Sequence, residues 1–307
     1  MKYARWLVVG IIVVALLAIP HLPFGNNKLL TILIQLFIVA ALASSWNILG
    51  GFAGQINLGH AAFFGLGALT TRLMWMNEYP LFLSFLAGGL VATLLAMIIG
   101  FPALRLRGTY FAIGTLALAQ AFFITVSNVL PGTSALLGPQ LINYELTPRY
   151  YLALGVLVVI VATAYWLTQT KLGLGMMSVR EDEDAAQAIG VNAFRHKMSA
   201  FVLSAFLAGV TGSTFAYFHV SYYYQFTFIP VWTFDAVLVT FVGGVGTVVG
   251  PLLGAIFFVI IRDVLATNVT NFHQIIFGVL FILVVLILPG GLMEIWDRFL
   301  IRVFRST

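Results

Sequence analysis

Long apolar runs separated by short polar turns fill the chain. A membrane-spanning helix needs about 20 mostly apolar residues. On that basis the pattern predicts about ten spans, at about 6–21, 28–49, 56–76, 81–102, 109–130, 150–169, 198–218, 232–248, 250–267 and 272–289. Because no stretch between them is long and polar enough for a soluble domain, residues 1–307 are expected to form a single transmembrane domain. Five spans in each half are an odd number, so the second half would cross the membrane in the opposite orientation to the first. An inverted repeat of two five-helix halves is therefore compatible with this count.

Composition narrows the class to an all-α integral membrane protein. The chain is 61% hydrophobic and 8% charged, whereas soluble domains carry about 25% charged residues. An outer-membrane barrel would alternate polar and apolar positions. The absence of cysteine excludes disulfides and thiolate metal sites. No catalytic or phosphate-binding motif is present, so we expect a transport protein without its own cofactor or metal rather than an enzyme.

Basic residues are distributed unevenly between the two sides of the predicted bundle. Eleven of the 15 Lys and Arg residues fall in 1–5, 102–108, 170–198 and 290–307. Because basic residues favour the cytosolic side, both termini and the 170–198 segment are expected in the cytoplasm. The net charge of +5 concerns this topology, and no nucleic-acid partner is expected. The first apolar run is interpreted as a retained span, with a cleaved signal peptide as the alternative.

One strongly charged segment lies at about 170–198, where eight of the 25 formal charges fall between 171 and 197. Ser178 and Glu181 have the spacing of a capping box, the following acids suit the positive end of a helix dipole, and Gly190 suits a helix stop. The spacing predicts a short helix over 179–189 with a small apolar face at Ala185, Ala188 and Ile189. Such a helix would be presented to a soluble partner; a solvated connecting loop is the alternative.

Polar side chains and glycines gather at 45–68 within the apolar pattern. Uncompensated polar groups are costly in hydrocarbon, so these side chains should face protein or a water-filled path. A second glycine-rich stretch occupies 243–254, at the corresponding place in the other half, which points to a transport pathway. Close helix packing through small residues is an alternative compatible with the first. The candidate solute-path residues are Asn47, Gly51, Gly54, Gln55, Asn57, Gly59, His60, Asp235, Gly243, Gly244 and Gly246.

Four motifs resemble the permease subunits of branched-chain amino acid ABC importers, the LivM-like group. They are WNILGGFAGQINLGHAAFFGLGA at 46–68, RLRGTYFAIGTLALA at 105–119, the stretch 171–216 that begins KLGLGMMSVREDEDAAQAIG, and GGVGTVVGPLLGA at 243–255. The resemblance implies the helical ABC importer permease fold and a cytosolic coupling helix that touches an ATPase. With Ser178 as its cap, that role falls on Arg180, Glu181, Asp182, Glu183, Ala185, Ala186, Ala188 and Gly190.

The resemblance also implies an assembly in a bacterial inner membrane. Its expected parts are a second homologous permease subunit, two ATP-binding cassette ATPases that bind ATP and Mg, and an extracytoplasmic solute-binding protein. Relatives often carry a Thr-Gly-Gly-rich stretch where this chain has PGTSALLGPQLI at 131–142. The resemblance makes branched-chain or related amino acids the expected solutes, and the departure at 131–142 favours the alternative of urea or another small solute.

Three other classes were weighed against this interpretation. A passive small-solute channel would need no ATPase and would leave the charged segment without a role. A proton-translocating subunit of a respiratory complex would place Lys and Glu in mid-membrane, and the predicted spans do not. A membrane enzyme lacks a catalytic constellation.

Overall fold

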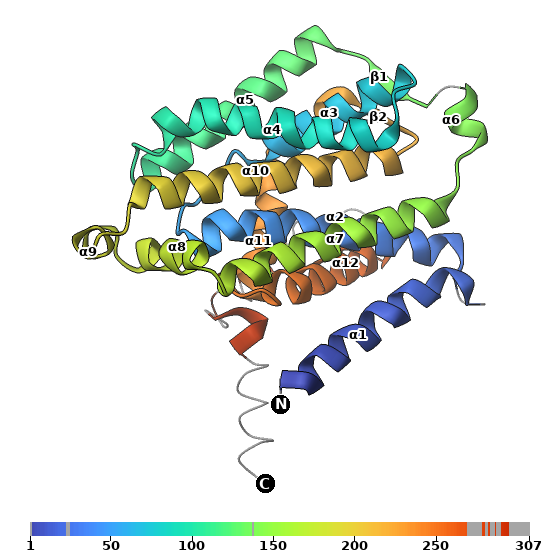
Figure 1. Ribbon diagram of the computed structural model, residues 1–307. Coiled ribbons are helices and arrows are strands. Elements are labelled where there is room, and N and C mark those ends of the chain that lie inside the picture. The colour runs from blue at the N-terminus through green and yellow to red at the C-terminus, as the bar shows by residue number, and fades with distance from the viewer. Residues whose placement is uncertain are drawn as a thin grey trace.

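The computed structural model describes residues 2–22, 25–136 and 138–268, and further along the chain only 278, 279, 282, 286 and 290–294. The described part is an assembly of helices packed lengthwise, with one small pair of strands (Figure 1). The bundle has two distinct ends. One carries the short helices α8 (Lys171–Glu181) and α9 (Glu183–Ala188), and the other carries strands β1 (Thr133–Ala135) and β2 (Ser221–Tyr223).

The helix α2 (Asn27–Asn47) lies at the centre of the bundle. Asn26 begins it, because its side-chain oxygen accepts a 2.8 Å hydrogen bond from the backbone N–H of Leu29. From Phe37 to Asn47 every residue is buried, so this helix is buried all round rather than on one face only. A single π-helical turn, Ile48–Phe52, continues it. Its neighbours are α7 (Leu146–Thr168), α10 (Ala193–Phe218), α11 (Val231–Gly243) and α12 (Gly250–Asn268).

A second layer packs on α10 and consists of α3 (His60–Met76) and α4 (Leu81–Ala103), with α5 (Thr109–Val129) outside it (Figure 1). Small residues let the backbones approach, since a Cβ atom on Gly67 would overlap the carbonyl group of Gly209. A Cβ on Gly212 would likewise overlap the carbonyl oxygen of Phe64. Such close crossings are typical of membrane helices.

Six helices of the described part are long and apolar enough to cross a membrane: Asn27–Phe52, Leu81–Ala103, Thr109–Val129, Leu146–Thr168, Ala193–Phe218 and Tyr224–Gly243. This finding supports an all-α membrane protein. The expected span at 56–76 begins only at His60, and the one expected at 232–248 already ends at Gly243, because glycine-containing loops occupy 53–59 and 244–249. The tenth predicted span, 272–289, lies largely outside the described residues, so the count of ten and the inverted repeat remain predictions.

The helix α1 (Lys2–Ala18), whose side chains are described from Gly10 onward, stands at the edge of the bundle (Figure 1). It is tied to α7, because the Tyr150 hydroxyl donates a 2.7 Å hydrogen bond to the carbonyl oxygen of Leu16. A short 3₁₀ turn, Ile19–His21, follows it.

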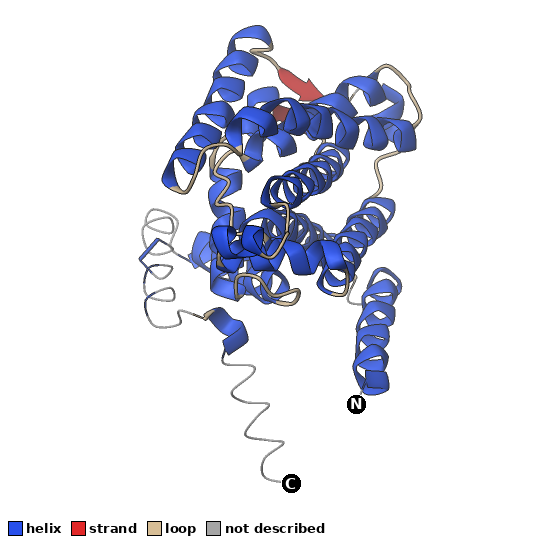
Figure 2. Cartoon of the chain, turned by 60° about the vertical axis from the view of Figure 1, so that its left-hand side comes forward, coloured by secondary structure: helices blue, strands red, loops and turns tan. Residues whose placement is uncertain are grey.

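The strands depart from the expected all-helical pattern. β1 and β2 pair antiparallel, with Ser134 opposite Tyr222, and Figure 2 shows them at one edge of the bundle. They join the segment around 131–142, where α6 (Gly138–Ile142) also lies, to the aromatic run that precedes α11. Within residues 222–232, Tyr222 and Phe228 are buried and pack against the bundle, whereas Tyr223 and Phe226 are exposed.

Candidate functional site

The two glycine-rich stretches meet through the side chain of Asn47, the last residue of α2. Its Nδ2 donates a 2.8 Å hydrogen bond to the carbonyl oxygen of Thr247, and its Oδ1 accepts one of 2.9 Å from the N–H of Gly246. Asn47 is 1% exposed, and its partners Gly246 and Thr247 are half-buried. A buried amide with donor and acceptor both satisfied stabilises one arrangement of the two loops.

Arg180 of α8 joins the charged segment to this junction. Its Nη1 donates a 2.7 Å hydrogen bond to the carbonyl oxygen of Gly51. Gly54 and Gly246 have φ of +69° and +78°, and a Cβ on either would crowd the Arg180 side chain. A Cβ on Gly51 would overlap Oδ1 of Asn47. We call Asn47, Gly51, Gly54, Arg180, Gly246 and Thr247 the glycine junction.

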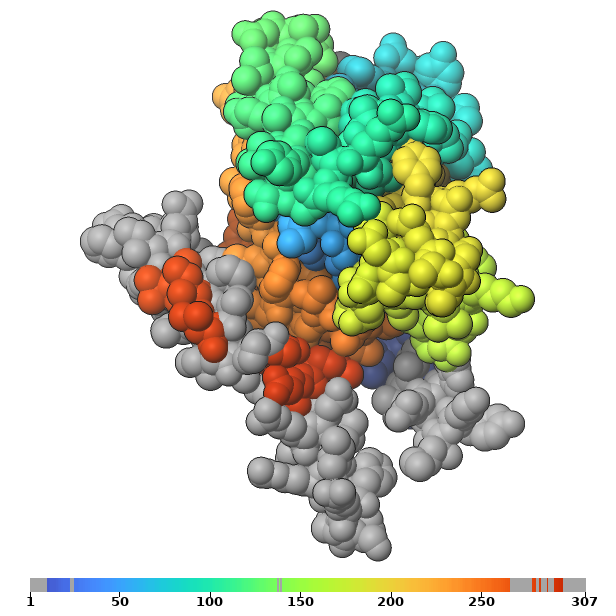
Figure 3. All heavy atoms as spheres, turned by 90° about the vertical axis from the view of Figure 1, so that its left-hand side faces the viewer, coloured from blue at the N-terminus to red at the C-terminus, as the bar shows by residue number. Residues whose placement is uncertain are grey.

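The glycine junction opens onto the α8–α9 end. Figure 3 looks onto that end: residues near position 50 (blue) lie in a hollow between the α4–α5 turn (teal) and the α8–α9 segment (yellow-green). Gly54 and Ile56 are exposed there and Gln55 is half-buried. The predicted coupling residue Arg180 and several predicted path residues therefore form one site, which the sequence pattern did not reveal.

The predicted helix at 179–189 is wrong in its start. Ser178 lies inside α8, where its hydroxyl donates to the carbonyl oxygen of Gly175 at 2.9 Å, so it is not a cap. The chain leaves helical geometry at Asp182, whose Oδ1 accepts hydrogen bonds from the N–H groups of Asp184 and Ala185 at 3.0 and 2.9 Å. Asp182 therefore caps α9 in place of Ser178, since its carboxylate satisfies two of the free N–H groups at the helix start.

The two faces of α9 differ from the prediction at Ala186. Ala186 is 3% exposed and packs with Val179 and Ala193 in a small apolar cluster. Ala185, Ala188 and Ile189 are exposed, as a face for a partner requires. Ala186 thus packs α9 against α8 and α10 and does not face a partner.

The end of α9 agrees with the prediction. Gly190 has a φ of +92°, and its N–H donates to the carbonyl oxygen of Gln187 at 2.9 Å. Asn192 then caps α10 by accepting a 2.9 Å hydrogen bond from the N–H of Arg195. Glu181, Asp182, Asp184 and Gln187 are exposed along the same segment.

Lys197 anchors α9 to α10, a role that the sequence did not indicate. Its side chain is 3% exposed and forms an ion pair with Glu183, whose side chain is 26% exposed. A second, exposed ion pair joins Arg107 of the α4–α5 turn to Asp184 at 3.6 Å. Exposed pairs contribute little to stability, whereas a buried cation depends strongly on its partner. The sequence signal that could have indicated this ion pair is a lysine on an otherwise apolar helix, 14 residues after Glu183.

Asn57, Gly59 and His60 form a separate buried group behind the glycine junction. Asn57 and His60 are 0% exposed. Nε2 of His60 lies 2.9 Å from the Ser45 hydroxyl, and Oδ1 of Asn57 accepts from the N–H of Gly59 at 2.8 Å. Nδ2 of Asn57 and Nδ1 of His60 have no hydrogen-bond partner in the described part of the protein.

The remaining predicted path residues lie at other levels of the bundle. Gly243 and Gly250 bring α11 and α12 together, because a Cβ on Gly243 would overlap the carbonyl oxygen of Gly250. Gly244 follows with a φ of +128°. Asp235 is half-buried eight residues before Gly243, about 12 Å along the helix axis. The structure does not bring it to Asn47, and the described residues contain no group of His, Asp and Glu that could hold a metal ion.

Two buried arginines organise the β1–β2 end. Arg149 donates through Nε to the carbonyl oxygen of Tyr217 at 3.0 Å, and Arg72 donates to that of His219. These carbonyls end α10, so the two cations stabilise the negative end of its dipole. The ring of His219 stacks on Phe215 at 3.8 Å. Burial lowers the pKa of His219 to about 4, with the charge of Arg72 acting in the same direction.

Comparison with known proteins places the chain in a family. A family model described as a permease component of branched-chain amino acid transport systems matches residues 28–285. The permease proteins LivM of Salmonella typhimurium and Escherichia coli, named as parts of high-affinity branched-chain amino acid transport systems, are each 27% identical over 282 residues. Those alignments cover 80% of this chain and 65% of each relative, so the chain spans just under two thirds of their length.

A nucleoside ABC transporter permease of Lactococcus lactis, NupC, is 26% identical over 190 residues, which cover 53% of this chain and 59% of that protein. No solved structure matches the chain significantly. The family match includes α2 to α12, and with them both glycine-rich stretches and the α8–α9 segment. The chain therefore belongs to the family of permease components of branched-chain amino acid transport systems.

Proposed function

We propose that this protein is the transmembrane permease subunit of an ATP-driven ABC importer that moves a small polar solute into the cell. The observation that carries the proposal is the hydrogen bond from Arg180 to Gly51, which joins an exposed charged segment to the end of the buried central helix. Movement of α8 and α9 by a partner would act directly on Gly51, Gly54 and Gly246. Membership in the permease family supports the same role.

The partner of α9 in this proposal is an ATP-binding cassette ATPase. The exposed acids of α9 and its small residues Ala185 and Ala188 form a compact projection that would fit a groove on another protein. The charges would favour one register of this contact. The complete unit would contain two ATPases, which bind ATP and Mg, a second homologous permease subunit and an extracytoplasmic solute-binding protein. This chain would hydrolyse no ATP itself.

The proposed location is a bacterial inner membrane, with about ten spans in two inverted halves and both termini in the cytoplasm. The excess of basic residues on the α8–α9 side supports that orientation. The exposed residues Gln187 and Ser221 lie at opposite ends of the bundle and test it. In intact cells an impermeant thiol reagent should label Ser221→Cys and spare Gln187→Cys. The reverse labelling would overturn the orientation.

The proposed solutes are branched-chain or related amino acids, by analogy with the LivM relatives. Urea or another small solute is the alternative, and the nucleoside permease relative supports a broader range. The path is proposed to run past Asn57 and His60, which offer unpartnered donors or acceptors without fixed charge. Groups of this kind bind a polar solute weakly enough for passage.

The test is solute uptake by the purified complex in vesicles, with ATP supplied or withheld. The proposal expects uptake of a branched-chain amino acid only with ATP and the binding protein. Uptake that runs down a gradient without ATP would indicate a passive channel. ATP-driven uptake of a nucleoside or urea alone would retain the importer and replace the solute.

A further inference from the structure

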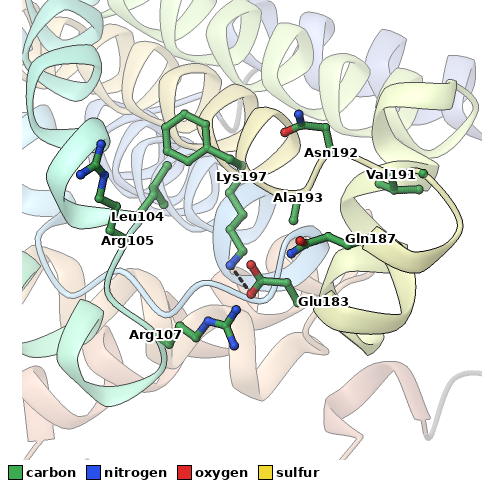
Figure 4. Close-up of a pocket in the computed structure, with 11 residues that line it drawn as sticks. Leu104, Arg105, Arg107, Glu183, Gln187, Val191, Asn192, Ala193 and Lys197 are labelled. Atoms are coloured by element: carbon green, nitrogen blue, oxygen red, sulfur yellow. Dashed lines mark hydrogen bonds and ion pairs between the residues drawn. The ribbon is translucent and has the colours of Figure 1, made fainter.

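A pocket of 540 Å³ lies beside α9, between the α4–α5 turn and the start of α10. Figure 4 shows its walls: Arg105 and Arg107 come from the turn, Glu183 and Gln187 from α9, and Lys197 from α10. A volume of this size is in the range that holds a small ligand or a lipid headgroup.

Positive charge predominates in this pocket. Arg105, Arg107 and Lys197 line it together with a single carboxylate, Glu183, which is paired with Lys197. Arg107 also faces Asp184 at 3.6 Å, in a pair that is exposed to solvent. The guanidinium of Arg105 has no carboxylate partner among the described residues. Within the described part of the chain, the pocket therefore offers Arg105 without a carboxylate partner and Arg107 in a weak pair.

An apolar stripe on α4 leads to this pocket. Its exposed side chains recur every three or four residues, so they share one face of the helix. They are Phe82, Leu86, Leu90, Leu94, Ile98 and Phe101, with exposed fractions from 40% to 80%. Arg105 follows Phe101 by four residues, and the ring of Phe101 lies 5.7 Å from that of Phe194, a residue of the pocket wall. The stripe and the pocket are thus continuous.

We propose that this pocket binds the phosphate headgroup of an anionic phospholipid, whose acyl chain lies along the α4 stripe. A membrane protein exposes α4 to lipid wherever no partner covers it, and cationic pockets between helices on the cytoplasmic side suit anionic headgroups. Arginine pairs with phosphate through two parallel hydrogen bonds, which gives the contact a defined geometry as well as charge complementarity. An amphiphile satisfies both the stripe and the cations, whereas a soluble anion would use only the second.

The bound lipid would also contact α9. Glu183, Gln187 and Gly190 form one wall of the pocket, and Ala186 holds the same helix in place from behind. A lipid at this position would restrain the segment that is proposed to meet the ATPase. The inference rests on membrane insertion and on the proposed cytoplasmic placement of this end, and its test measures bound lipid rather than transport, so failure of the one is distinguishable from failure of the other.

The experiment measures retained lipid on the purified protein by native mass spectrometry, in detergent with equal amounts of phosphatidylglycerol and phosphatidylcholine. We expect wild type to retain phosphatidylglycerol preferentially. The double variant Arg105→Gln/Arg107→Gln should lower that retention about 25-fold, or about fivefold for each arginine. Phe101→Ser should weaken it without removing a charge. Lys171→Gln removes an exposed cation outside the pocket at the same end and should have no effect.

Three results would overturn the inference. One is equal retention of the two lipids by wild type. The second is unchanged phosphatidylglycerol retention in the double variant. If that variant keeps the lipid but loses its ATPase partner, the arginines belong to a protein contact. The third is displacement of the lipid by millimolar inorganic phosphate, which would indicate a site for a free anion. A melting temperature equal to that of wild type in phosphatidylcholine shows that each variant is folded.

Discussion

The Arg180 guanidinium donates a 2.7 Å hydrogen bond to the carbonyl oxygen of Gly51, 129 residues earlier in the chain. It also forms a 3.0 Å ion pair with Glu181, next to the cap of α9. One side chain therefore contacts both the charged surface segment and the end of the central helix. A movement of α9 would therefore displace the Arg180 side chain and with it the hydrogen bond to Gly51, as coupling between two sites requires.

Replacing Arg180 by Gln should separate ATP hydrolysis from transport. The hydrogen bond to Gly51 and the contact of the guanidinium with Gly246 are lost, whereas glutamine keeps the Cβ and Cγ atoms that lie against Gly54. A hydrogen bond to a charged group is worth about 1.5–3 kcal/mol. We expect ATP-driven uptake in vesicles to fall at least about tenfold while ATPase activity of the assembled complex persists. Arg195→Gln, at an exposed arginine in the first turn of α10, is the control. Equal uptake in Arg180→Gln and wild type would contradict the role of Arg180.

The two alanines of α9 should respond differently to arginine. Ala188 is exposed, so Ala188→Arg should leave the melting temperature unchanged but abolish co-purification with the ATPase. Ala186 is packed against Val179 and Ala193, so Ala186→Arg should destabilise the α8–α9 segment by about 1–3 kcal/mol through overpacking. Thermal unfolding and co-purification, measured on both variants, distinguish the two effects. A stable Ala188→Arg variant that still binds the ATPase would place the contact elsewhere.

Removing either partner of the ion pair between Lys197 and Glu183 should change the stability of the protein by a different amount. The Lys197 side chain is 3% exposed and that of Glu183 is 26% exposed, so only the carboxylate can reach water when its partner is lost. Glu183→Gln should therefore destabilise the protein by about 3 kcal/mol, because it leaves a buried cation unpaired. Lys197→Met should cost less, and the double variant should recover most of the loss.

Thermal unfolding in detergent measures this series. Asp184→Asn, which breaks the exposed pair with Arg107, is the matched control and should leave the unfolding midpoint unchanged. A larger loss in Lys197→Met than in Glu183→Gln would mean that Lys197 stabilises α10 by something other than its charge.

Stability should fall at acidic pH through His219. Its pKa is lowered by burial from 6.5 to about 4, so the neutral ring is the folded form. Below pH 6.5 the unfolded chain takes up a proton that the folded protein does not, and stability decreases until the pH reaches about 4. Between pH 7.5 and 5 this linkage amounts to about 2 kcal/mol.

The comparison of wild type with His219→Gln isolates this contribution. The variant should show a smaller loss of melting temperature between pH 7.5 and 5, while His196→Gln, at a residue near the opposite end of α10, should behave as wild type. An identical pH dependence in wild type and His219→Gln would exclude His219 as the titrating group.

Much of the bundle could be predicted because its signals are local. Twenty apolar residues suffice to specify a spanning helix in lipid, where backbone groups must be satisfied within the segment. α4 and α5 accordingly begin where the pattern placed them, at Leu81 and Thr109. Gly190 ends α9 as predicted, because a left-handed helix stop depends on that residue alone.

The misplaced start of α9 has a non-local cause. Ser178 and Asp182 can both cap a helix, and local pattern favoured Ser178. The structure selects Asp182, where Ala186 packs on Val179 and Ala193 and Glu183 reaches Lys197. A helix that starts after Ser178 and one that starts after Asp182 use the same residues. Only packing against α10 decides between these two starts.

By itself the sequence determined the membrane class, the approximate helices and the charged segment with its acidic surface, because hydropathy and helix capping act over a few residues. Only the tertiary structure decided that Asn47 meets Gly246 across 199 residues and that Arg180 completes this junction. It also decided that the α4 stripe ends in a cationic pocket. These arrangements depend on hydrogen bonds and close backbone approach between distant segments, which leave no periodic signal in the chain.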